Sequence, residues 1–367
     1  MANTAFLAAA LAASAPAAAP AFDLTGVWHG TIGTLPVRAC FARRDWGAFG
    51  AYFYMSRLRT IPLEAEEGQG SSFREGGGED PKRPRWRIEK TGPGLSGSWS
   101  GGGRTLPIRL AAVRIAEGEE DPCASRAFHE PRLQGVRTVS TRGAIDGVAY
   151  TRLTLSNADR FDTSVETLAL DGASAAVRRI NAELARPLSG EPPPWLECIQ
   201  EGLRYTPYEG WSNETLKPAM ATARWLSVAH HWDGFCGGAH PDSSDNYRTF
   251  DRFTGAELDV LDWLNASAVK RERSEGMEEE TKTLRPAFRR VVIAGWKAED
   301  KECATVAANE QFWNAGLSRT GFIFTPQLPH VAHACAEALR VPFARLRPFL
   351  TPEGVKQVRA LESENRR

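Results

Sequence analysis

Residues 235–251, FCGGAHPDSSDNYRTFD, follow two adjacent histidines and hold a dense group of side chains that could do chemistry. Imidazole and carboxylate groups are ligands for zinc or iron, and they also act as acid/base pairs in hydrolysis. The possible metal ligands here are His230, His231, Asp233, His240 and Asp242. A hydrolase would use His240 with Asp242 or Asp251.

The spacing does not favour either chemistry. On a strand, His230 and His231 point to opposite faces, so both reach one ion only if a bulge interrupts the strand. The chain has neither an HExxH helix nor a GxSxG motif, and we expect no metal and no cofactor. Asp259 and Asp262 could form a carboxylate pair for glycoside chemistry, but they also suit the start of a short helix.

A structural interpretation accounts for more of the segment. Gly237 and Gly238 permit unusual backbone angles, and Pro241 fixes another, so a bridged Cys236 would hold the loop in one shape. Rigid exposed loops suit binding because little ordering entropy remains to be lost. The sequence therefore predicts a binding surface at residues 233–245, whose candidate contacts are His240, Tyr247, Trp211, Trp232 and Trp263.

The six cysteines make an even number, and none forms a CxxC pair. In an exported chain this pattern predicts three disulfides and no free thiolate nucleophile. We prefer the sequential pairing, which keeps each bridge within one structural unit, although the sequence leaves other connectivities open. The preferred pairs are Cys40 with Cys123, Cys198 with Cys236, and Cys303 with Cys335.

Residues 1–21 are almost all small or apolar and end in Ala19-Pro20-Ala21, a pattern that a signal peptidase could cut. We expect an export signal, with a disordered Ala/Pro arm as the alternative. No other run reaches the ~18 apolar residues of a membrane span, so a periplasmic or secreted protein is predicted. The 45 basic and 45 acidic residues cancel, which argues against a nucleic-acid partner.

The fold class predicted is α+β. Residues 22–116 contain short aromatic and branched segments separated by Gly or Pro, which indicate an antiparallel sheet or small barrel. GVWHG at 26–30 and GSWSG at 97–101 suggest matched bulky plugs in a filled barrel, with a small apolar ligand as the alternative. Residues 66–84 read as an exposed loop, residues 117–145 as a linker with connecting strands, and residues 146–367 as a mixed α+β domain.

The motifs CGGAHP, FDRFTGAELDVLDWL and GFIFTP carry a resemblance. Residues of about 160–350 resemble an extracytoplasmic domain of unknown function that occurs in the anti-sigma-V factor ectodomain and beside some peptidoglycan deacetylase domains. The matching positions are Gly238, Ala239, His240, Pro241, Phe250, Asp251, Thr254, Gly255 and Leu258.

This resemblance implies an α+β ectodomain that recognises partners at the cell envelope, including lysozyme. We therefore expect an exported envelope binding protein with a lysozyme-like protein or a glycan as its partner. The alternatives are the hydrolase that uses His240 and a carrier of apolar ligands in the N-terminal β domain.

Overall fold

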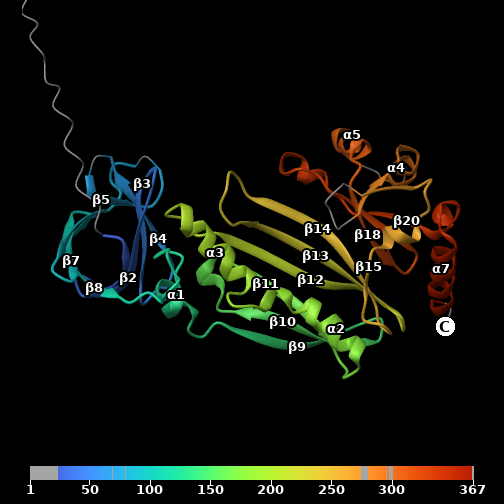
Figure 1. Ribbon diagram of the computed structural model, residues 1–367, viewed down its shortest axis with the longest axis horizontal. Helices are drawn as coiled ribbons and strands as arrows, with labels where there is room; N and C mark the ends of the chain where they lie inside the picture. Colours follow the sequence, from blue (N-terminus) through green and yellow to red (C-terminus); the bar gives the residue numbers. More distant parts are fainter. Residues whose placement is uncertain are drawn as a thin grey trace, which may run out of the picture.

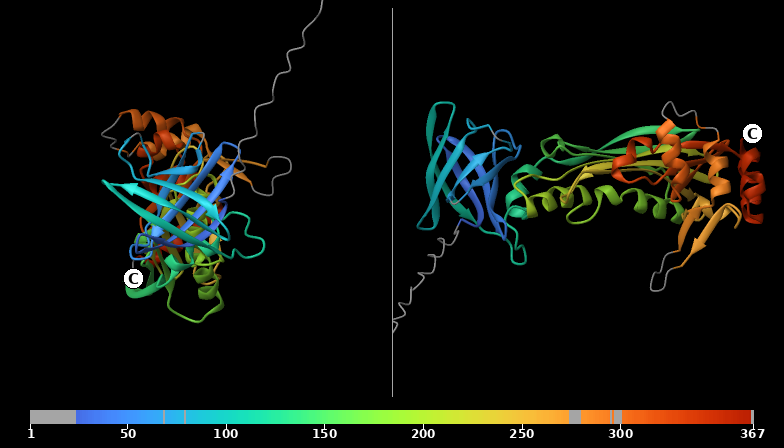
Figure 2. Two further views of the ribbon diagram at one scale, coloured as in Figure 1. Left: turned by 90° about the vertical axis from the view of Figure 1, so that its left-hand side faces the viewer. Right: turned by 90° about the horizontal axis from the view of Figure 1, so that it is seen from above.

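The computed structural model describes residues 24–67, 69–78, 80–273, 280–294, 296 and 301–365. The predicted export signal lies outside these residues. The fold is α+β, as predicted: a barrel stands at one end, a long sheet spans the middle, and a smaller α/β unit stands at the other end (Figures 1 and 2).

The barrel is closed and its eight antiparallel strands follow chain order. Its interior is filled by bulky side chains such as Phe41, Phe73 and Trp86, each fully buried, which favours a structural barrel over a ligand carrier. The strands are β1 (Gly26–Ile32), β2 (Leu35–Arg44), β3 (Gly47–Tyr54), β4 (Ile61–Glu66), β5 (Gln69–Glu75), β6 (Arg85–Thr91), β7 (Gly94–Gly101) and β8 (Arg104–Val113).

The prediction of one exposed loop over residues 66–84 was wrong for its first half. Strand β5 lies there and pairs with β4 and β6, and its Phe73 is buried inside the barrel. Closing the barrel satisfies the backbone groups of this polar segment, and a single apolar side chain suffices to anchor it. The low apolar content of the segment indicates a loop, but it does not reveal the neighbouring strands that pair with β5.

A seven-stranded sheet follows, in the order β15-β14-β13-β12-β11-β10-β9. Neighbouring strands are antiparallel except β11 and β12, which are parallel. The strands are β9 (Arg137–Ile145), β10 (Val148–Ser156), β11 (Ser164–Leu170), β12 (Trp211–Ala221), β13 (Trp225–Phe235), β14 (Asp242–Asp251) and β15 (Glu257–Leu258). Helices α2 (Ala175–Leu184) and α3 (Pro194–Tyr205) lie along one face of this sheet (Figure 1).

Local sequence explains α2. The Ser174 side chain accepts a hydrogen bond from the backbone N–H of Val177 and so caps the helix. Ile180 and Leu184, one turn apart, are buried against the sheet with Leu168 and Phe250.

Within the described residues, the C-terminal unit packs a three-stranded sheet, a two-stranded sheet and four α-helices around one core. Thr351 caps its last helix by accepting from the Gly354 N–H, and Pro352 follows at the first helical position, where its missing N–H is not needed. The elements are β16 (Val269–Glu272), β17 (Thr281–Leu284), α4 (Pro286–Ile293), α5 (Lys301–Asn309), β18 (Trp313–Ser318), β19 (Gly321–Pro326), β20 (Leu339–Pro342), α6 (Phe343–Leu346) and α7 (Pro352–Glu364).

The barrel meets the sheet through helix α1 (Arg126–Leu133) and the C-terminal end of α3. Phe49 and Phe53 of the barrel pack in one cluster with Phe128 of α1 and Leu203 of α3. Such a shared apolar core fixes the orientation of the barrel relative to the sheet. The exact domain boundaries stay a prediction.

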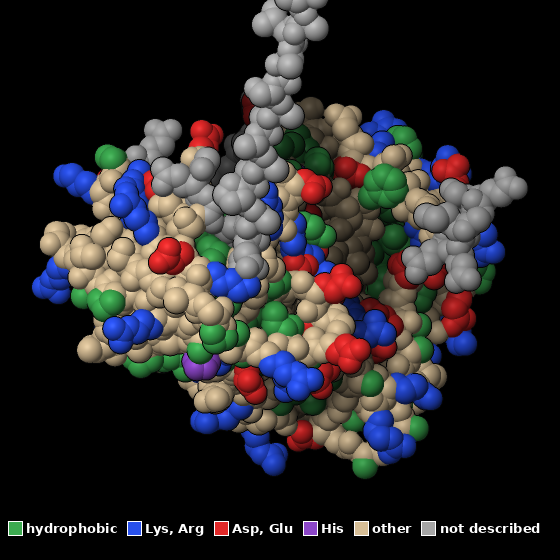
Figure 3. All heavy atoms as spheres, turned by 60° about the vertical axis from the view of Figure 1, so that its left-hand side comes forward, with side chains coloured by type: hydrophobic (Ala, Val, Ile, Leu, Met, Phe, Trp, Pro, Cys, Tyr) green, Lys and Arg blue, Asp and Glu red, His purple; other side chains and the backbone are tan. Residues whose placement is uncertain are grey.

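Three disulfides join Cys40 to Cys123, Cys198 to Cys236, and Cys303 to Cys335, which is the sequential pairing preferred from the sequence. Bridges of this number are typical of chains that fold in an oxidising compartment. Within the described ranges, every helix is too short or too polar to cross a membrane. With the barrel end turned forward, Figure 3 shows acidic and basic side chains interspersed over the surface, in line with the zero net charge.

Candidate functional site

The loop singled out in the sequence connects β13 to β14 and is tied to α3 by the Cys198–Cys236 disulfide. Gly237 and Gly238 have φ of +98° and +97°, a region that favours glycine. The loop is therefore the stapled turn that its composition indicates.

The two adjacent histidines point to opposite faces of the sheet, as expected on a strand. His230 Nε2 lies 2.9 Å from Glu214 Oε1. On the other face, His231 Nδ1 lies 2.8 Å from Asp245 Oδ1 and its Nε2 lies 3.2 Å from Asp233 Oδ1. Among the residues that the structure describes, no three His, Cys, Asp or Glu side chains converge as metal ligands would.

His240 is exposed and stacks on His330, with ring centroids 4.7 Å apart. It lines a hollow of about 350 Å³ together with Asp242, so a pairing of these two residues in hydrolysis stays a prediction. Asp251 lies at the far end of β14, roughly 30 Å along the strand from Asp242. The alternative pairing of His240 with Asp251 is therefore wrong.

Asp251 has a structural role instead. It is 4% exposed, pairs with Arg224 Nη2 at 3.1 Å, and accepts hydrogen bonds from the N–H groups of Phe253 and Thr254. These bonds hold the turn after β14. A carboxylate so occupied is not free to act as a base.

Two predicted contact residues differ in solvent exposure: Trp263 is buried, whereas Tyr247 is half-buried. Trp263 is 6% exposed and packs against Trp225 in the C-terminal core, which removes it from any binding surface. It lies on the short helix Val260–Trp263, and its side chain also packs against Phe322 in that core. Tyr247 lines a hollow of about 410 Å³ on the sheet face, and burial raises the pKa of its hydroxyl. Trp211 and Trp232 are half-buried on β12 and β13.

Asp259 and Asp262 start a helix rather than forming a glycosidase pair. Asp259 caps the short helix by accepting from the Leu261 N–H. Lys282 Nζ lies 2.8 Å from Asp259 Oδ2 and 2.6 Å from Asp262 Oδ1, so one ammonium bridges the two carboxylates.

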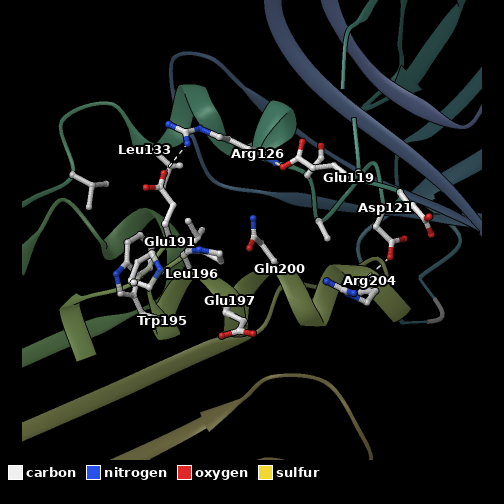
Figure 4. Close-up of a pocket in the computed structure, with 18 residues that line it drawn as sticks. Glu119, Asp121, Arg126, Leu133, Glu191, Trp195, Leu196, Glu197, Gln200 and Arg204 are labelled. Atoms are coloured by element: carbon white, nitrogen blue, oxygen red, sulfur yellow. Dashed lines mark hydrogen bonds and ion pairs between the residues drawn. The ribbon is translucent and has the colours of Figure 1, made fainter. Parts of the chain in front are cut away.

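A larger groove, of about 780 Å³, has one wall in the segment that the sequence predicted to be a linker with connecting strands. One wall is the segment 118–136, which includes α1, and the other is α3 with the residues before it. Figure 4 shows Trp195, Glu197 and Gln200 along α3, with Arg126 across from them. The apolar part of the lining consists of Ala124, Leu133, Val136, Pro192, Pro193, Trp195 and Leu196.

Acidic groups are in excess around this groove. Five carboxylates line it against two guanidinium groups. Both arginines are already engaged: Arg126 with Glu191 at 2.8 Å, and Arg204 with Glu201 at 3.1 Å. The carboxylates are those of Glu119, Glu120, Asp121, Glu191 and Glu197.

Several of these acceptors lack partners. One Glu119 oxygen accepts from the Arg126 N–H at 2.9 Å, whereas the other, Oε2, is buried with no hydrogen-bond partner. In the described part of the chain, Glu120 and Glu197 pair with no cation. A buried acceptor without a donor is costly, so the groove is suited to a ligand that supplies N–H donors and positive charge.

Sequence reasoning missed this groove for a clear reason. The acidic run Glu119-Glu120-Asp121 lies in the predicted linker, and such runs are usually solvated surface. Only the packing of α1 beside α3 places them over an apolar floor. A usable signal was the amphipathic stretch PWLECIQEGLRY, whose apolar residues recur at helical spacing.

No family model and no curated protein matches this sequence. Among solved structures, it is similar to a DUF3298 family protein from Pseudomonas aeruginosa PAO1, at 14% identity and a TM-score of 0.34, over 60% of this chain and 95% of that chain. It is also similar to a DUF3298 family member from Bacteroides fragilis, at 10% identity and a TM-score of 0.34, over 62% and 96% of the two chains. Likeness at this level carries no argument about function, and the resemblance to the anti-sigma-V factor ectodomain stays a prediction.

Proposed function

We propose that this chain is an exported binding protein that recognises a cationic polypeptide through the groove between α1 and α3. The observation that supports the proposal is the excess of carboxylates, some without partners, over an apolar floor. The carboxylates of such a surface complement the charged ends of basic side chains, and its apolar lining packs against their aliphatic parts. A lysozyme-like protein, the partner implied by the sequence resemblance, is basic and fits this chemistry.

The groove is also preformed. Its α3 wall is held by the Cys198–Cys236 disulfide and by burial of Ile199 and Leu203, and its α1 wall by the buried side chain of Phe128. A rigid site loses little conformational entropy when it binds, so more of the contact energy is retained as affinity.

The test is a calorimetric titration of the chain with lysozyme and with succinylated lysozyme, in which the lysines carry negative charge. We expect micromolar or tighter binding of the first and none of the second. The variant Glu120→Lys/Glu197→Lys should weaken binding about tenfold or more, because it reverses the two unpaired charges. Glu89→Lys, an exposed change on barrel strand β6, is the matched control and should leave affinity unchanged.

Equal affinity of the double variant and the wild-type chain would remove the groove from the proposal. Absence of heat with lysozyme at several temperatures would remove the proposed partner.

A glycan is the second candidate, and the hollow at Tyr247 favours it. The side-chain hydroxyl groups of Thr215 and Tyr247 lie at this hollow and have no hydrogen-bond partner within the described ranges. Polar groups around an aromatic ring suit a hydroxylated ligand. Titration with an N-acetylglucosamine oligomer tests this candidate, and Tyr247→Ala should abolish the binding without weakening lysozyme binding.

A further inference from the structure

Three exposed aromatic residues lie around the junction of the barrel with α3. Trp46 is 61% exposed, Tyr205 is 52% exposed and Tyr208 is 38% exposed. Large aromatic rings are mostly buried in folded chains, and exposed ones that gather at one place commonly mark an interaction surface. We call Trp46, Tyr205 and Tyr208 the junction patch.

The patch is rigid. Trp46, in the turn between β2 and β3, stacks on the buried Phe49 with ring centroids 5.3 Å apart and planes 13° apart. The Tyr208 hydroxyl donates to Glu64 Oε1 at 2.5 Å, and Glu64 is the cross-strand partner of Phe49. Trp46 contacts Phe49, and Tyr208 contacts Glu64 on the adjacent strand. The two aromatic residues therefore lie on the same area of the outer barrel wall.

Arg44 connects this patch to the groove. Its Nε donates to the carbonyl of Arg204 at 2.9 Å, and its guanidinium pairs with Asp121. Arg204 and Asp121 both line the groove, and Tyr205 follows Arg204 directly. The junction patch is therefore adjacent to the end of the groove that Asp121 and Arg204 line.

We infer that the junction patch and the groove form one continuous recognition surface, in which the patch takes apolar side chains of the same cationic polypeptide. This inference rests on the proposed function and extends it: the partner must be long enough to place basic groups in the groove and an apolar group on Trp46. Tryptophan and tyrosine dominate the energetic centres of protein interfaces because they offer large, rigid contact areas.

The test compares two probes, lysozyme and penta-lysine, in calorimetric titrations. Penta-lysine carries the positive charge that the groove needs and no apolar group for the patch. We expect Trp46→Ala/Tyr205→Ala to weaken lysozyme binding about tenfold or more while penta-lysine affinity stays within about twofold of wild type. Phe253→Ala, at a 68% exposed position in the turn after β14, is the matched control and should change neither affinity.

Folding is checked by the melting temperature, and Trp46→Phe, which keeps an aromatic ring over Phe49, should retain most of the lysozyme affinity. Unchanged lysozyme binding by the double alanine variant overturns the inference, and the proposed function still stands if Glu120→Lys/Glu197→Lys weakens binding. Loss of penta-lysine binding in the double alanine variant also overturns it, because the substitutions would then act on the groove itself. If the wild-type chain does not bind lysozyme, the proposed function and this inference both fail.

Discussion

Arg132 of α1 and Glu209, just before β12, form a two-pronged ion pair across the junction between the barrel and the sheet. The Arg132 side chain is 0% exposed. Its remaining donors reach the carbonyls of Leu58, in the barrel, and Arg160, beside the sheet, at 2.9 and 2.8 Å, and its guanidinium lies 4.1 Å from the ring centroid of Phe161. One side chain therefore bonds to both parts of the molecule.

Removing this side chain should destabilise the protein strongly. Arg132→Ala leaves the Glu209 carboxylate without its partner and two carbonyls without donors. Such a loss typically lowers the free energy of unfolding by about 3–5 kcal/mol. Urea denaturation measures the loss. Arg126→Ala is the control, because Arg126 makes an exposed pair with Glu191 and its removal should change stability by less than about 1 kcal/mol. Similar losses in the two variants would contradict the role assigned to Arg132.

His129 should make stability depend on pH. Burial, with a smaller contribution from the positive charge of Arg132, lowers the pKa of its imidazole from 6.5 to about 3. The imidazole binds a proton more readily in the unfolded chain than in the folded one. The free energy of unfolding is therefore highest above pH 6.5 and falls as the pH is lowered from 6.5 towards 3, by up to about 1.4 kcal/mol per pH unit.

This dependence is measured as the difference in unfolding free energy between pH 7.5 and pH 5, in the wild-type chain and in His129→Gln. The variant should show a shallower dependence on pH. His29→Gln, at an exposed position on β1, should keep the wild-type slope. An identical slope in His129→Gln would show that the imidazole protonates equally in both states.

The Cys198–Cys236 disulfide closes a loop of 38 residues, and Cys303–Cys335 closes one of 32. Replacing either pair with serine should cost about 3–4 kcal/mol, because the unfolded chain then gains conformational freedom. The loops are of similar length, so unfolding experiments on the two double variants should give similar losses. A difference of several kcal/mol would mean that native contacts, rather than chain entropy, dominate one of them.

Salt should weaken lysozyme binding if the groove carboxylates carry the recognition. At an ionic strength of 0.1 M, charges are screened over about 10 Å, and over less at higher salt. We expect affinity to fall steadily between 50 and 500 mM NaCl, measured by calorimetry, and to depend much less on salt in Glu120→Lys/Glu197→Lys. Salt-independent binding by the wild-type chain would point to a mainly apolar contact.

Features set by neighbouring residues could be predicted from the sequence. The alternating strands of the barrel, helix α2 with its Ser174 cap and helix α7 with its Thr351 cap all follow from patterns a few residues long. The stapled loop followed from Gly237, Gly238 and Cys236, and the opposite directions of His230 and His231 followed from the geometry of a strand. Each of these depends on backbone preferences that act locally.

The tertiary structure alone decided what depends on packing between distant segments. Strand β5 forms because β4 and β6 pair with it in the barrel. Trp263 is buried because the C-terminal core packs around it. Asp251 is separated from His240 by the length of β14. The groove arises because α1 and α3, more than sixty positions apart in the sequence, lie side by side. Composition and short-range periodicity carry no information on such distances, so the sequence determined the elements and their covalent staples, and the packing decided which side chains share a surface.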